Sequence, residues 1–172
     1  MAGFTMRLLK TVLLVAVTVL AAGCSSKFKT YNGPEVTQII VNKTERRMYL
    51  LHQKDVLKAY DVELGFTAGG HKQFEGDGKT PEGNYFIDRR NPNSSFHLSL
   101  GISYPNAQDI AFAKSAGKSP GGDIFIHGRP NEKFFKFNMP PDWTAGCISV
   151  TNRQIERIYA MVRDGTPIQI NP

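Results

Sequence analysis

One cysteine and one upstream histidine are the residues of this chain that could carry covalent chemistry. Cys147 lies in the segment Asp-Trp-Thr-Ala-Gly-Cys-Ile-Ser-Val, and His127 lies twenty positions earlier in Ile-His-Gly. The other cysteine, Cys24, falls at the end of a segment typical of an export leader. A thiol attacks as its thiolate, and a nearby imidazole can take the proton. The pattern predicts Cys147 as a nucleophile with His127 as its base.

Glycines accompany both residues, and each has a use in acyl transfer. The backbone N–H groups of Gly146 and Cys147 are the natural donors for an oxyanion. Gly128, directly after the histidine, lets substrate and backbone approach closely. A structural interpretation stays open for both side chains, because free cysteine is among the most buried residue types and a histidine can be a satisfied core residue.

Several other residues are candidates for contacts with a substrate. Arg129 could bind a carboxylate through its forked donors or could be an ordinary surface arginine. Trp143 and Tyr104 could line a cleft or pack in the core, and Thr144 belongs to the same segment as the cysteine. For His97, which alternates with apolar neighbours, a structural role is favoured over a site role. No His or Cys pair has metal-ligand spacing, so neither a metal nor another cofactor is predicted.

Residues 1–23 are predicted to be a cleavable signal peptide. A basic start precedes the largely apolar stretch Leu8–Leu20, which is too short for a comfortable membrane span, and Ala-Ala-Gly follows before Cys24. This end resembles a bacterial lipoprotein box, which implies lipidation of Cys24, and Ser26 then favours the outer membrane. The alternative is ordinary cleavage that leaves a soluble periplasmic protein. Residues 24–34 are predicted to be a tether.

Cleavage before Cys24 would leave 149 residues, enough for the single domain that is predicted over residues 35–172. The leader contains two basic residues and no acidic one, so its removal lowers the net charge from +6 to +4. The basic residues are dispersed, which excludes a nucleic-acid partner as the main interpretation and favours a solvated surface. The oligomeric state is not indicated.

The hydrophobic pattern predicts many short strands and little helix. The stretch 56–64 alternates and predicts a strand with one buried face. A helix is predicted over 152–162, with Ile155, Ile158, Tyr159 and Val162 on its buried face. We expect a mostly β sandwich or barrel with one or two short helices. The other predicted strands are 36–41, 47–51, 84–88, 96–104, 123–127 and 168–170, with loops at 65–83 and 89–95 and one or two helical turns within 106–122.

Four segments together resemble the YkuD-type L,D-transpeptidases. These are Leu-Gly at 64–65, Lys-Thr-Pro-Glu-Gly-Asn-Tyr at 79–85, His-Gly at 127–128 and Thr-Ala-Gly-Cys-Ile at 144–148. The resemblance covers essentially the whole domain. Two positions depart from the pattern of many members: Ala145 stands where a second histidine is common, and Ser149 stands where an arginine is common.

The resemblance implies a fold, a reaction and a location. A YkuD-like β fold would present Cys147 to a murein stem tetrapeptide and release its terminal D-Ala, with the carbonyl of Gly128 orienting the histidine. The acyl group would pass to an amine, or to water in a carboxypeptidase or amidase. A catalytically silent murein-binding lipoprotein is the alternative from another class. Peptidoglycan stem peptides and, through the lipid, a membrane are the expected partners in the periplasm.

Overall fold

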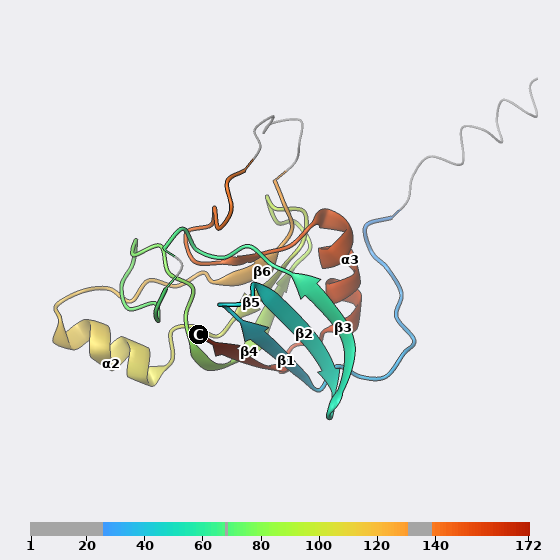
Figure 1. The fold of residues 1–172 in the computed structure, drawn as a ribbon, viewed down its shortest axis with the longest axis horizontal. Coiled ribbons are helices and arrows are strands. Elements are labelled where there is room, and N and C mark those ends of the chain that lie inside the picture. The colour runs from blue at the N-terminus through green and yellow to red at the C-terminus, as the bar shows by residue number, and fades with distance from the viewer. Residues whose placement is uncertain (1–25, 68, 131–138) are drawn as a thin grey trace, which may run out of the picture.

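The computed structural model describes residues 26–67, 69–130 and 139–172, which form eight strands and two helices (Figure 1). The predicted lipidation site at Cys24 and the leader lie outside the described residues. The elements are β1 (Gln38–Asn42), β2 (Arg47–His52), β3 (Asp55–Asp61), β4 (Gly83–Asn91), β5 (Ser99–Ile102), α2 (Ala107–Ser115), β6 (Phe125–His127), β7 (Ile148–Ser149), α3 (Asn152–Met161) and β8 (Pro167–Asn171).

The strands form one curled sheet in the order β3-β2-β1-β8-β4-β5-β6-β7. Strand β4 is the corner, because its first half pairs with β8 and its second half with β5, with an irregularity between Ile87 and Arg89. Past β3, Glu63 bridges to Ser149 of β7, so the two ends of the sheet meet. The expected mostly β sandwich or barrel is confirmed.

Helix α3 covers the apolar inside of the curl. Ile155, Ile158 and Val162 are buried, as predicted, while Tyr159 is partly buried against the core. The side chains of Thr151 and Gln154 cap the first turn reciprocally, which satisfies backbone donors that a helix start leaves unpaired. Helix α2 instead projects away from the sheet on the side opposite α3 (Figure 1).

Three elements differ from the sequence predictions. The buried face predicted for the stretch 56–64 is confirmed only in its second half: Tyr60, Val62 and Leu64 are buried, whereas Val56 is 56% exposed because β3 is the edge strand of the sheet. Strand β4 continues to Asn91, through the first three residues of the predicted loop 89–95. Strand β7, a two-residue element beside β6, was not expected.

The described part of the predicted tether lies against the domain without forming a helix or strand. Lys27 Nζ donates to the backbone oxygens of Pro92 and His97, and Lys29 pairs with Glu156 of α3 at 3.3 Å. Within residues 26–67, 69–130 and 139–172, no helix has the length and hydrophobicity needed to cross a membrane.

Candidate active site

The pairing of β6 with β7 indicates that Cys147, which directly precedes β7, shares a face of the sheet with His127. Strands β6 and β7 are parallel, with Ile126 opposite Ile148 and His127 opposite Ser149. Continuing that register by one residue sets Phe125 beside Cys147, and side chains two residues apart on a strand share a face. From a strand spacing of ~4.8 Å and a rise of ~3.3 Å per residue, the two Cα atoms lie roughly 8 Å apart, which is within reach of facing side chains.

His127 is buried and held by its backbone neighbour. Its Nδ1 lies 2.6 Å from the carbonyl oxygen of Gly128, so Nδ1–H donates there and Nε2 carries the lone pair. Burial lowers the pKa of His127, and the Gly128 bond opposes that only partly. The imidazole is therefore neutral at pH 7 and fit to accept a proton.

Two aromatic rings fix the plane of this imidazole. Phe96 lies against the His127 ring with 4.5 Å between centroids, and Trp143 meets it edge-on at 5.7 Å. Phe96 was not identified from the sequence, because nothing in the segment before β5 marks it as facing β6. Trp143 was named as a cleft or core residue, and it is next to the histidine.

The Cys147 thiol is protonated in the resting site. Its Sγ lies 3.5 Å from the carbonyl oxygen of Asp123. Burial raises the pKa of Cys147, the backbone N–H of Phe125 lowers it, and the charge of Asp123 raises it further. Because the pKa of the thiol is raised and that of His127 is lowered, the resting pair is a neutral thiol with a neutral imidazole. For such a thiol to attack a carbonyl, a base such as His127 would have to take its proton.

The Thr-Ala-Gly turn before the cysteine is held by its own threonine. The buried Thr144 donates Oγ1–H to the carbonyl of Cys147 at 2.7 Å and accepts from the Gly146 N–H at 3.2 Å. Gly146 has a φ of +134°, and a Cβ there would come within 2.6 Å of the Lys79 carbonyl oxygen. The Gly146 N–H, expected as an oxyanion donor, is thus engaged by Thr144 in this state.

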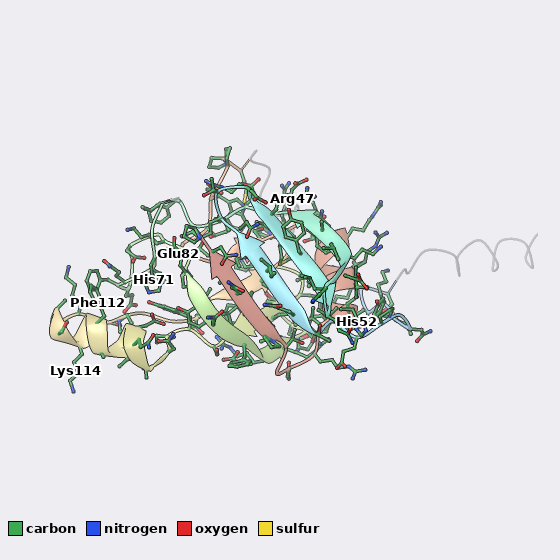
Figure 2. The ribbon with its side chains drawn as sticks, turned by 60° about the horizontal axis from the view of Figure 1, so that its bottom comes forward. Arg47, His52, His71, Glu82, Phe112 and Lys114 are labelled. Atoms are coloured by element: carbon green, nitrogen blue, oxygen red, sulfur yellow. The ribbon has the colours of Figure 1, made fainter. Side chains whose placement is uncertain are left out.

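The loop between β3 and β4 packs against the turn at Gly146. The buried Lys43 ammonium donates to the carbonyls of Gly70 and Thr80 and pairs with Glu82 at 2.7 Å. His71 accepts from the Glu82 N–H and contacts Asp109 of α2 at 2.9 Å, and Figure 2 shows His71 and Glu82 near each other between the sheet and α2. These contacts fix the loop whose Lys79 carbonyl limits position 146.

Asp142 anchors the start of the cysteine segment to two other parts of the fold. Arg46 donates Nε and Nη2 to its carboxylate, and the Leu64 N–H donates to Oδ1 at 3.0 Å. Its own N–H donates to Glu63. Burial raises the pKa of Asp142, but the bonds from Arg46 and Leu64 outweigh it, and the net pKa is lowered. No role for Asp142 was predicted from the sequence.

Three further residues that the sequence singled out have other contacts. His97 contacts Glu156 of α3 through Nε2 at 2.9 Å, so its ring is committed to the helix. Arg129 is exposed just after the His-Gly pair, with its backbone N–H donating to the Asn152 side chain. Tyr104 is buried and donates to the Pro120 carbonyl. Among the residues that the structure describes, no cluster of three His, Cys, Asp or Glu side chains could hold a metal ion.

Comparison with known proteins places this site in a family. The model of the YkuD family, the L,D-transpeptidase catalytic domain, matches residues 36–170. YafK of Escherichia coli (strain K12), a protein assigned to the L,D-transpeptidases, is 28% identical over 141 residues, which cover 79% of this chain and 50% of YafK. The chain therefore spans about half the length of the curated relatives it matches.

Solved structures of other proteins are also similar to this chain. The helical cell shape determining protein Pgp2 of Campylobacter jejuni is 25% identical with a TM-score of 0.59, covering 86% of this chain and 51% of Pgp2. Bd1075 of Bdellovibrio bacteriovorus is 25% identical with a TM-score of 0.55, covering 83% and 50%. L,D-transpeptidase 1 of Mycobacterium tuberculosis, at 12% identity and a TM-score of 0.51 over 80% of this chain and 62% of that one, shares the fold. The chain belongs to the YkuD family of L,D-transpeptidase catalytic domains.

Proposed function

We propose that the protein is a murein L,D-transpeptidase with Cys147 as its nucleophile and His127 as its general base. The observation that carries the proposal is the 2.6 Å contact of His127 Nδ1 with the Gly128 carbonyl, which leaves Nε2 as a proton acceptor on the face that bears Cys147. Membership of the L,D-transpeptidase family supports a murein stem peptide as substrate.

The first half of the reaction makes a thioester. His127 Nε2 takes the thiol proton as sulfur attacks the carbonyl of the third residue of a stem tetrapeptide. The C–N bond to the terminal D-Ala breaks, and the imidazolium returns the proton to the leaving amine. The neutral resting pair suits both proton transfers. The Cys147 N–H is the donor that we assign first to the oxyanion, because Thr144 engages the Gly146 N–H.

The second half transfers the acyl group to an amine. The acceptor nitrogen attacks the thioester, its proton passes through His127 to sulfur, and an amide forms with the thiol restored. With water in place of the amine the same site is a carboxypeptidase or amidase. Ser149 is buried at the position where many members carry an arginine, and this difference keeps the hydrolytic alternative open. Ala145, at the position of a common second histidine, likewise keeps open the alternative of a silent murein-binding protein.

The test is turnover of a defined donor. Purified domain incubated with murein tetrapeptides should release D-Ala and yield a cross-linked product by mass spectrometry. Release of D-Ala with only a shortened tripeptide would assign water as the acceptor. No release under conditions where the thiol is intact would contradict the enzyme and favour a binding protein.

The location is part of the same proposal. We place the domain in the periplasm, held to the outer membrane by lipid on Cys24, since a domain that acts on murein must leave the cytoplasm. The apolar stretch that precedes Ala-Ala-Gly-Cys supports this assignment. The soluble periplasmic form is the alternative.

A further inference from the structure

A row of paired residues crosses β4, β5 and β6 and leads to the candidate nucleophile, which directly precedes β7. Arg89 of β4 is opposite Gly101 of β5, and Gly101 is opposite Phe125 of β6. The β6–β7 register extended by one residue sets Phe125 beside Cys147. Laterally paired residues point to the same face of a sheet. Arg89 therefore lies on the face of the sheet that carries the thiol.

Gly101 lets the Arg89 side chain extend along this row. A Cβ at position 101 would overlap Cγ of Arg89, so the arginine occupies the space that any other residue would fill. The guanidinium carbon then lies 4.5 Å from the centroid of the Phe125 ring. The arginine thus reaches across β5 to the strand next to the thiol.

The positive charge remains open to solvent beside the site. Arg89 Nη1 contacts both carboxylate oxygens of Asp88 at 2.9 and 3.0 Å, and Nη2 makes one longer contact of 3.2 Å with Asp123. Asp123 also supplies the carbonyl next to the Cys147 sulfur. Its side chain is 91% exposed, against 40% for Arg89. An ion pair this exposed contributes little, so an incoming carboxylate can replace Asp123 on the guanidinium.

We propose that Arg89 binds a free carboxylate of the donor stem peptide and so helps to select the donor. The inference rests on the proposed function. In a tetrapeptide donor the terminal carboxylate lies one residue beyond the scissile carbonyl, at a reach of ~3.5 Å. The guanidinium lies over Phe125 of β6, so it is about one strand spacing, ~4.8 Å, from the neighbouring chain at Cys147. A carboxylate on the side chain of the third residue is the other source of the same chemistry.

The experiment compares three donors: the tetrapeptide, its terminal carboxamide, and the tetrapeptide with the third-residue carboxylate amidated. Amidation of the carboxylate that Arg89 binds should lower kcat/KM of the wild type by about 10- to 100-fold, the range for a hydrogen bond to a charged group. In Arg89→Gln that amidation should have no effect. Asp123→Asn, which removes a competing carboxylate, should lower KM for the free acid.

The matched control is Arg47→Gln. Arg47 is another half-exposed arginine paired with an aspartate, Asp61, and it lies on β2, which does not carry the site. It should keep the wild-type preference. Complete alkylation of Cys147 by iodoacetamide, together with an unchanged Tm, checks that the thiol site is intact in each variant; the rate is not used, because the charges of Arg89 and Asp123 both influence the pKa of the thiol.

The outcomes separate the two proposals. Turnover by the wild type with the same acid preference in Arg89→Gln would overturn the role of Arg89 alone. An equal loss by Arg89→Gln on all three donors would also overturn it, because it would indicate a structural role. No turnover of any donor by the wild type would remove the proposed function and, with it, the carboxylate site.

Discussion

Replacing Asp142 with alanine should loosen the segment that carries the candidate nucleophile, Cys147. The substitution removes the acceptor of the Arg46 guanidinium and of the Leu64 N–H, in a side chain that is 15% exposed. A hydrogen bond to a charged group contributes ~1.5–3 kcal/mol, and a buried donor left unpaired costs ~1–3 kcal/mol. Because Arg46 is 36% exposed, water will compensate for part of the free energy lost with its hydrogen bonds. We expect a total of about 3 kcal/mol.

Thermal unfolding measures this directly. For a domain of ~150 residues, 1 kcal/mol corresponds to ~2–4 °C in Tm, so Asp142→Ala should melt roughly 6–12 °C lower. Asp142→Asn keeps an oxygen for the Leu64 N–H and should lose less. The rate of alkylation of Cys147 should change in the alanine variant, since Asp142 lies five residues before the thiol in the same segment.

Asp61→Ala is the matched control. Asp61 also pairs with an arginine, Arg47, but its side chain is 85% exposed. An exposed pair contributes ~0–1 kcal/mol, so its loss should barely change Tm. Equal Tm shifts for Asp61→Ala and Asp142→Ala would refute the view that Asp142 anchors the cysteine segment.

Three further predictions concern the core, the loop and the anchor. Ile158→Ala should cost ~2–5 kcal/mol of stability in thermal unfolding, because Ile158 is fully buried; a shift no larger than for exposed Arg153→Ala would contradict the packing of α3. Burial raises the pKa of Asp77, but bonds from three backbone N–H groups and a lysine outweigh it and bring the pKa to about 2. The ionised Asp77 therefore stabilises the folded state at pH values above ~4, the pKa of the unfolded group, and this stabilisation is lost as the pH falls to about 2. Asp77→Asn should therefore lower Tm at pH 7, and a deficit that persists at pH 2 would refute this. Labelled palmitate should enter the wild type and not Cys24→Ser; equal labelling would remove the lipid anchor.

The fold class was predicted from the sequence because it depends on local patterns, and the same kind of pattern singled out Cys147 and His127 as the candidate pair. The alternation of apolar residues located most strands, and the apolar spacing of 152–162 located the helix that the structure places at Asn152–Met161. Element ends were less predictable. The alternating stretch 56–64 buries its predicted face only from Tyr60 to Leu64, because β3 is the edge strand of the sheet, a property of topology that alternation does not encode.

The residues around the candidate pair could not be predicted, because they too depend on the topology of the sheet. Phe96 is far from His127 in the sequence, and Asp142 is far from its partners Arg46 and Leu64, so only the folded sheet brings these residues together. The row from Arg89 to Cys147 depends on a strand of two residues, β7, and on a continuation of β4 into a predicted loop. Pairwise register, which long-range contacts set, decides such neighbours.

The rate of Cys147 acylation as a function of pH tests the central claim most directly. A carbapenem should add its mass to Cys147 of the wild type and not to Cys147→Ala. The wild-type rate should fall as pH drops below the lowered pKa of His127, because the imidazole is then protonated. His127→Ala should be slower by ~10²–10⁴ near neutral pH. It should recover as pH rises towards the raised pKa of the thiol, which then ionises without a base. Acylation of His127→Ala at the wild-type rate at pH 7 would contradict the account.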